Sequence, residues 1–381
     1  MKKWQKNSRK SQLIMYNQLF KGYTTPQARW ARFGSYYAMS PSEFALEVID
    51  NYSQIGDFVL DPFAGRGTSI YATSALDRSG TGIEINPVGF IFAQTKLNPA
   101  KKENVIKKLL EIDKASQNHH YNLNLLPQFF RHCFCDEVLY FLLTAKDELD
   151  WINNNVDRTL MGFILASLHD NIGCGLSNQM RRTKSMSMEY SIKWWAKQGL
   201  SEPPRVDPCA MLLSKIDWRY KKGIPSNLQS VIHFGDSVNI LDTLPAKKYS
   251  LMLTSPPYQG VTDYHNDQWL RLWMLDKRHQ ISSNIDQKKH QGRFANKADY
   301  QNLLNNVFEK SARLMQDNCV VYVRTDSREF TLKATEAALK AAFPEHTMTI
   351  IDKPIPEGKI TQTQFFGTKP IKSGEVDIIL Q

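Results

Sequence analysis

The chain has 381 residues, of which 42% are hydrophobic and 23% are charged, so it can bury a sizeable core and global disorder is excluded. The chain has no run of about 18 apolar residues, and we therefore expect no membrane span. The formal net charge of +10 fits a nucleic-acid partner as well as it fits an ordinary solvated basic surface.

The five cysteines are irregularly spaced, so we expect reduced thiols in a cytoplasmic protein and no zinc or other metal site. The first six residues are polar and basic, unlike a signal peptide. Residues 1–32 carry basic side chains and no acidic one. This stretch predicts either a basic N-terminal arm that follows a phosphate backbone or a solubilising tail.

The first elements predict a βαβ unit. An amphipathic pattern over residues 41–49 predicts a helix. The apolar run 58–60 predicts a buried strand, and residues 68–76 predict the helix that follows it. A second strand is expected over residues 81–85. Strand, helix and strand in this order indicate a parallel sheet.

The pattern then becomes mainly helical over residues 101–228, including helices over 137–149 and 160–168, a stretch too long for an ordinary connection. Strands are expected again after it. The expected elements are strands at 231–234, 251–253 and 319–323, helices at 301–314 and 333–342, and an antiparallel pair formed by 348–351 and 376–380. These patterns predict one α/β domain interrupted by an insertion.

A glycine loop follows the first strand, with the sequence Asp61-Pro62-Phe63-Ala64-Gly65-Arg66-Gly67-Thr68. Glycines at this point allow a positive φ and the close approach of a bulky ligand. The carboxyl end of a strand in a parallel sheet is also the usual ligand crevice. Glu84, at the end of the second strand, could accept ribose hydroxyls, or it could be merely solvated. Asp236 could accept from an adenine amino group or serve as a turn residue.

A second loop, Thr254-Ser255-Pro256-Pro257-Tyr258, follows the strand expected at 251–253. The two loops together resemble the S-adenosylmethionine-dependent DNA amino methyltransferases. The resemblance implies a Rossmann-like class I methyltransferase fold, with residues 33–100 and 229–381 as the catalytic domain. It also implies that the segment 36–44 closes over the methionine part of S-adenosylmethionine. The implied cofactor-binding residues are Tyr37, Met39, Asp61, Pro62, Phe63, Gly65, Gly67, Thr68, Glu84, Asp236 and Thr254.

The resemblance implies a catalytic role for the second loop. Ser255 and the carbonyl of Pro256 would accept the hydrogens of an exocyclic amine, Pro257 would stiffen the loop, and Tyr258 would stack on a flipped base. The methyl group would then pass directly to nitrogen. Cytosine C5 chemistry is not expected, because Tyr258 stands where that reaction needs cysteine.

Two interpretations of the target base stay open, cytosine N4 and adenine N6. Ser255 favours cytosine N4 within the family. The order of the motifs resembles instead the adenine N6 class, which carries its target-recognition domain between them. Residues 101–228 would then be that domain. Cytosine N4 remains the favoured target.

We expect double-stranded DNA as the partner, together with a possible cognate restriction endonuclease, in a bacterial or phage protein that is a monomer or weak dimer. Basic and aromatic residues predict the DNA contacts, and they are Arg181, Arg182, Lys184, Trp194, Trp195, Lys221, Lys222, Tyr264, His265, Lys288 and Lys289. An RNA base methyltransferase and a nonenzymatic DNA-binding protein are the alternatives. Binding of S-adenosylmethionine would separate an enzyme from a mere binder.

Overall fold

The computed structural model describes residues 20–35, 40–118, 121–225, 229–260, 264–276, 296–353 and 374–381. These residues form a seven-stranded sheet in the order β3-β2-β1-β4-β5-β7-β6. The strands are β1 (Phe58–Asp61), β2 (Ser79–Glu84), β3 (Val231–Phe234), β4 (Tyr249–Thr254), β5 (Met315–Asp326), β6 (Met348–Lys353) and β7 (Glu375–Leu380). The first five strands are parallel, and β7 pairs antiparallel with both β5 and β6. The predicted mainly parallel α/β sheet with a C-terminal antiparallel pair is confirmed.

The sheet is buried on both faces, because successive side chains of a strand point to opposite sides. Val59 and Leu251 belong to a core beneath α3 (Ser42–Tyr52), α4 (Thr68–Ala75) and α5 (Pro87–Leu97). Leu60 and Met252, the next residues along, belong to a second core beneath α16 (Lys297–Ala312) and α17 (Glu329–Ala342). Helices α3, α4 and α5 therefore cover one face of the sheet, and α16 and α17 cover the other.

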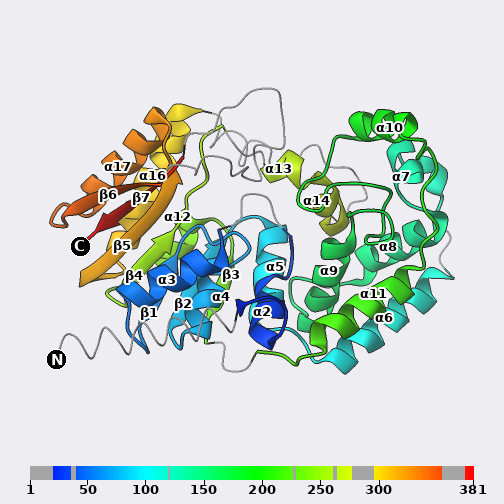
Figure 1. Ribbon diagram of the computed structural model, residues 1–381, viewed down its shortest axis with the longest axis horizontal. Coiled ribbons are helices and arrows are strands. Elements are labelled where there is room, and N and C mark those ends of the chain that lie inside the picture. The colour runs from blue at the N-terminus through cyan, green and yellow to red at the C-terminus, as the bar shows by residue number, and fades with distance from the viewer. Residues whose placement is uncertain are drawn as a thin grey trace.

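The insertion between β2 and β3 is helical in its described residues. Its helices are α6 (Lys102–Ser116), α7 (Gln128–Cys133), α8 (Asp136–Glu148), α9 (Asn155–Ser167), α10 (Met188–Lys197) and α11 (Pro208–Tyr220). Two of them begin at strong local signals: Asn154 caps α9, and Asp207 caps α11 just before Pro208. Figure 1 shows these helices gathered at one end of the molecule and the sheet at the other, with α5 near the junction.

One hydrophobic core runs from the sheet into the insertion. Ile91 of α5 and Ile164 of α9 lie in the same buried cluster as Val59 of the sheet. Helix α14 (Trp269–Leu275), which follows the second loop in the chain, packs against α8 of the insertion. The ring nitrogen of Trp269 also donates to the carbonyl of Met186, at 3.0 Å. The insertion and the sheet therefore share one hydrophobic core.

The basic N-terminal stretch departs from the predicted arm where it is described. Phe20 is buried, and so is Trp30 of α2 (Pro26–Ala31). The ring nitrogen of Trp30 donates to the carbonyl of Gly223, 3.1 Å away. An arm over residues 1–32 is therefore wrong for residues 20–32, because aromatic side chains anchor them to the end of the insertion. Residues 1–19 lie outside the described residues.

All five cysteines are free thiols, and every one except Cys174 is buried. In the described ranges, no helix combines the length and apolar character needed to cross a bilayer. The same ranges hold no group of three or more histidine, cysteine, aspartate or glutamate side chains arranged to bind a metal ion.

Candidate active site

The glycine loop leaves β1 through two residues with left-handed backbone. Gly65 has φ +55° and Gly67 has φ +71°, a region that side chains disfavour. A β-carbon on Gly67 would lie 2.8 Å from Cβ of Ala93, which is too close. At Gly65 the corresponding position faces open space among the described residues. The loop is therefore packed against α5 on the Gly67 side and open to a ligand on the Gly65 side.

Asp61 holds the start of this loop. Its Oδ1 accepts from the backbone N–H of Phe63 at 3.0 Å, and its Oδ2 accepts from the hydroxyl of Ser69. Oδ1 also accepts from the hydroxyl of Thr254, at 2.7 Å. Burial raises the pKa of this carboxyl, while the three donors oppose the shift. Asp61 thus binds groups of both loops through Oδ1 and the first turn of α4 through Oδ2.

Glu84 ends β2, the strand next to β1, and its side chain is 9% exposed. Its Oε1 accepts from the backbone N–H of Asn86, at 2.7 Å. Burial penalises the charged form and raises the pKa of Glu84 to about 7. A β-carbon on Gly89 would lie 3.0 Å from Cγ of Glu84, so the first turn of α5 closes tightly on this carboxylate. An acceptor at this position suits the vicinal hydroxyls of a ribose.

Asp236 follows β3 and caps α12 (Ser237–Ile240) by accepting from the backbone N–H of Val238 at 3.0 Å. The hydroxyl of Ser237 donates to the carbonyl of Pro62. This short helix is therefore tied to the glycine loop, and the contact of Asp236 with an adenine amino group stays a prediction.

The two loops meet because their strands are neighbours. Val59 of β1 pairs with Leu251 of β4, and Leu60 pairs with Met252. Strand β2 lies on the far side of β1 and β5 on the far side of β4, so the chain changes direction across the sheet between β1 and β4. The carboxyl ends of strands at such a point form the ligand crevice of open parallel sheets. The Thr254 hydroxyl bonded to Asp61 joins the loops directly.

The second loop is anchored at its prolines and carries half-buried polar groups. Pro256 and Pro257 are buried, whereas Ser255 and Tyr258 are partly exposed. The Ser255 hydroxyl donates to the Tyr258 hydroxyl, which lies 3.4 Å away. The Tyr258 hydroxyl lies 3.5 Å from Oε1 of Glu375, at the start of β7. Ser255 and Tyr258 therefore share one partly exposed surface, while the two prolines hold the loop from beneath.

Arg328 fixes the end of this loop. Its guanidinium donates to the carbonyl of Gln259. It also donates to both carboxylate oxygens of Asp326, at 3.0 and 2.7 Å. A bidentate arginine–carboxylate pair is geometrically specific. Arg328, which precedes α17, and Asp326, the last residue of β5, thus position the loop beyond Tyr258.

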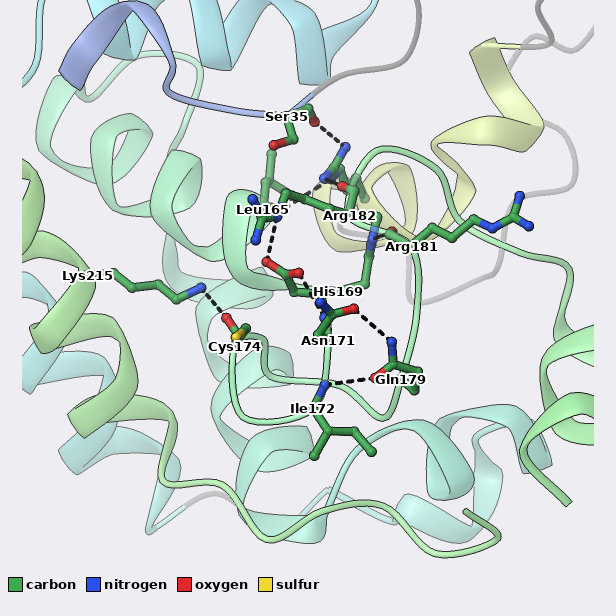
Figure 2. A network of polar contacts seen from close by, with 12 residues as sticks. Ser35, Leu165, His169, Asn171, Ile172, Cys174, Gln179, Arg181, Arg182 and Lys215 are labelled. Atoms are coloured by element: carbon green, nitrogen blue, oxygen red, sulfur yellow. Dashed lines mark hydrogen bonds and ion pairs between the residues drawn. The ribbon is translucent and has the colours of Figure 1, made fainter. Parts of the chain in front are cut away.

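A buried arginine joins the insertion to the segment that precedes α3. Arg271 of α14 is fully buried and donates to the carbonyls of Leu165 and Ser35, both at 3.0 Å, and of Arg182 at 2.8 Å. Figure 2 shows these carbonyls converging from separate segments. Ser35 immediately precedes residues 36–39, which include the predicted cofactor residues Tyr37 and Met39 and lie outside the described residues.

The basic stretch after α9 is held by the same network. His169 Nδ1 lies against the carbonyl of Arg181 (Figure 2), and burial holds the pKa of His169 well below its ordinary value. Arg182 Nε donates to Asp170 at 2.8 Å, and Lys184 pairs with Asp267. Two of the predicted DNA-contact cations are therefore engaged with carboxylates of the protein.

The structure corrects the prediction for one tryptophan. Trp195 is fully buried, and its ring nitrogen donates to the carbonyl of Gln179 at 2.7 Å. It is therefore a core residue rather than a DNA contact. Trp194, its neighbour, is half-buried. The spacing of Met188, Ile192 and Trp195 along α10 is the 3–4 repeat of a helix face that packs inward, and it was the signal for this burial.

The remaining predicted DNA contacts are spread over several elements. Lys221 and Lys222, just after α11, are exposed. His265, in α13 (Tyr264–Asp267), is buried. Tyr264 begins that helix, and Lys288 and Lys289 lie outside the described residues.

Three residues of the site were missed from the sequence. Arg271, Arg328 and Glu375 lie outside both motifs, and no local pattern distinguishes them from other charged residues. Each becomes informative only when strands or helices from distant parts of the chain are brought together.

The sheet order and the paired loops are those of the Rossmann-like class I methyltransferase fold. A family model for N6 and N4 methyltransferases, described as DNA methylase, matches residues 1–90. The type II methyltransferase M.MthZI of Methanothermobacter thermautotrophicus is 30% identical over 115 residues, which are 29% of this chain and 32% of that protein. The type II methyltransferase M.BsoBI of Geobacillus stearothermophilus is 23% identical over 290 residues, 68% of this chain and 53% of that protein. The matched regions thus span about a third and about half of these relatives.

These findings support a likeness between this chain and the DNA amino methyltransferases. Among solved structures, the precorrin-6y C5,15-methyltransferase of Geobacter metallireducens aligns with a TM-score of 0.33 and 9% identity, over 91% of this chain and 92% of that one. The rRNA methyltransferase aviRa of Streptomyces viridochromogenes aligns with a TM-score of 0.32 and 10% identity, over 90% and 86%.

Proposed function

We propose that this protein transfers a methyl group from S-adenosylmethionine to the exocyclic amine of a base flipped out of double-stranded DNA, with cytosine N4 favoured over adenine N6. The hydrogen bond between Asp61 and Thr254 carries the proposal, because it joins the glycine loop and the Pro-Pro loop at one crevice. The choice of cytosine rests on Ser255.

The residues of the crevice suit S-adenosylmethionine. Glu84 supplies a buried carboxylate for the ribose, and the open side of Gly65 leaves room for the body of the ligand. Tyr37 and Met39 would close over its methionine part. When bound, this substrate supplies an electrophilic methyl group on a sulfonium.

The Pro-Pro loop suits the acceptor base. Ser255 and the carbonyl of Pro256 would accept the two hydrogens of the amine, which draws the nitrogen lone pair away from the ring. Tyr258, only partly exposed on the same loop, would stack on the base. Base flipping is needed because the amine lies inside the duplex until the base is extruded.

We further propose that the insertion contacts DNA and that the protein, of bacterial or phage origin, acts in the cytoplasm within a restriction–modification system. The exposed side chains of Arg181, Lys221 and Lys222 support contact with phosphates. The two relatives are named type II methyltransferases, which supports the restriction–modification role and a cognate endonuclease as partner. We expect a monomer or weak dimer.

The test is mass spectrometry of nucleosides from the DNA of a methylation-free bacterial host that expresses the protein. We expect new 4-methylcytosine, which disappears in Tyr258→Ala and persists in Tyr190→Ala, a control at an exposed tyrosine of α10. New 6-methyladenine would overturn the choice of base. If neither base appears, binding of S-adenosylmethionine would turn attention to RNA, and failure to bind it would favour a nonenzymatic DNA-binding protein.

A further inference from the structure

A polar path leads from the catalytic serine to a carboxylate on a different part of the sheet. Ser255 Oγ lies 3.4 Å from the Tyr258 hydroxyl, which lies 3.5 Å from Oε1 of Glu375. These contacts are longer than ordinary O–H···O bonds. The Glu375 side chain is 50% exposed, so the path ends at water.

The chemistry of the three groups sets the direction of this path. An ionised carboxylate only accepts, so the Tyr258 hydroxyl must donate its proton to Glu375. Its oxygen lone pairs then accept from Ser255. With its own proton directed toward Tyr258, Ser255 presents lone pairs to any group on its other side. Glu375 therefore orients Ser255 as an acceptor, the role that an amine N–H requires.

Resting on the proposed function, we propose that Glu375 is the terminal proton acceptor of the methyl transfer and that it acts through Tyr258 and Ser255. Serine has little basicity of its own, so a loop with serine at this position needs a base elsewhere. The structure places the Glu375 carboxylate 3.5 Å from the Tyr258 hydroxyl, which in turn lies 3.4 Å from Ser255 Oγ.

The proton balance is as follows. The amine nitrogen uses its lone pair to form the N–C bond while the C–S bond of the sulfonium breaks, and that electron pair stays on sulfur. The methylated nitrogen is then cationic and releases one N–H proton to Ser255 Oγ. Ser255 passes its proton to the Tyr258 oxygen, Tyr258 passes its own to Glu375, and Glu375 releases it to water. Each hydroxyl ends as it began.

The surroundings of Glu375 hold it in this position. Its Oε2 lies 3.5 Å from Nη1 of Arg324 on β5. The Arg324 guanidinium is itself fixed by two hydrogen bonds to the Asp377 carboxylate, at 2.7 and 2.9 Å. Its Cζ also lies 3.4 Å from the centroid of the Phe44 ring. The strand register sets Asp326 of β5 opposite Glu375. One carboxylate oxygen thus faces a fixed cation and the other faces Tyr258.

The first test compares Glu375→Gln with Glu375→Asp and with the control Glu345→Gln, an exposed glutamate between α17 and β6. Purified variants are assayed with tritiated S-adenosylmethionine and DNA from the methylation-free host. We expect Glu375→Gln to lower kcat by about 100-fold, at the low end of the range for general acid–base catalysis, with KM values changed less than about twofold. Glu375→Asp should recover part of the loss.

The double variant Tyr258→Phe/Glu375→Gln separates a relay from two independent defects. Members of one unit are not additive, so its kcat should be no lower than that of the worse single variant. Multiplication of the two losses, or a wild-type kcat for Glu375→Gln, would overturn the proposal. An inactive wild-type protein would instead count against the proposed function.

A second measurement needs no activity. In protein labelled with [13Cζ]tyrosine, the signal of Tyr258 is assigned by its loss in Tyr258→Phe. We expect this signal to shift in Glu375→Gln and to stay in place in Glu345→Gln, because the phenol of Tyr258 donates to Glu375. An unmoved signal in Glu375→Gln would overturn the relay even if the enzyme is active.

Discussion

The hydroxyl of Thr254 donates to Oδ1 of Asp61 at 2.7 Å and so joins the last residues of two adjacent strands, β4 and β1, which lie 193 positions apart in the chain. Asp61 begins the glycine loop and Thr254 begins the Pro-Pro loop. The relative position of the two loops therefore depends on one buried contact as well as on the pairing of their strands.

We expect Thr254→Val to destabilise the protein by about 1–3 kcal/mol, because it leaves the buried Asp61 carboxylate without one of its donors. Valine matches threonine in shape, so packing should change little. Urea unfolding measures the effect. Thr243→Val is the control, since the Thr243 hydroxyl bonds the carbonyl of Ile240 in an exposed turn. Equal unfolding free energies for the two variants would contradict the role of the contact.

We expect the Glu84 carboxyl to make the stability of the protein depend on pH. Burial raises its pKa in the folded state from 4.5 to about 7, so folding favours the protonated form. The resulting stability is complete below about pH 4.5 and is lost as the pH rises to about 7, a loss of roughly 3 kcal/mol for this shift. In Glu84→Gln that part of the dependence should vanish. Unfolding curves at several pH values, with Glu345→Gln as the control, check this outcome.

The two glycines of the first loop should respond differently to alanine. Gly67→Ala combines a φ of +71° with a 2.8 Å contact to Ala93, so we expect it to destabilise the protein by about 2 kcal/mol or more. Gly65→Ala meets no neighbour and should cost about 1 kcal/mol in strain. It should lower affinity for S-adenosylmethionine instead. Thermal unfolding and calorimetric titration of each variant measure the two effects, and an affinity loss confined to Gly67→Ala would refute the assignment of the open side.

Lys221 and Lys222 test the proposed DNA surface. If both neutralise phosphates, Lys221→Ala/Lys222→Ala should lower the slope of log K against log salt concentration by about 1.8, since each contact contributes about 0.9. Fluorescence anisotropy with duplex DNA at several salt concentrations measures the slope. Lys333→Ala/Lys340→Ala on α17 is the matched control. A slope unchanged in the first pair would remove this part of the insertion from the interface.

The strands that carry the two loops were predictable because they are short apolar runs that end at a glycine or proline signal. Residues 231–234 were predicted as a strand and form β3. The ends of longer elements were harder, since β5 begins at Met315 and α9 begins at Asn155, both N-terminal to the predicted starts. Polar residues at these ends join the element through pairing and capping, which apolar patterns do not record.

The polar groups around the site could not be predicted, because they depend on tertiary pairing. Glu375 reaches Tyr258 only because β7 returns antiparallel beside β5. Trp195 is different, because its apolar spacing with Met188 and Ile192 was a sequence signal for burial that the basic composition of the stretch obscured. Composition describes the average character of a segment, whereas the contacts of a side chain depend on the direction in which it points.

The core that continues from Val59 through Ile91 to Ile164 has a practical meaning for engineering. A chimera that exchanged residues 101–228 as a cassette would cut through this core and replace half of a packed interface. Changes of sequence preference are better sought in the exposed loops and cations of the insertion, with α5 and α9 left intact. In this scaffold the part that would read DNA is also part of what holds the sheet together.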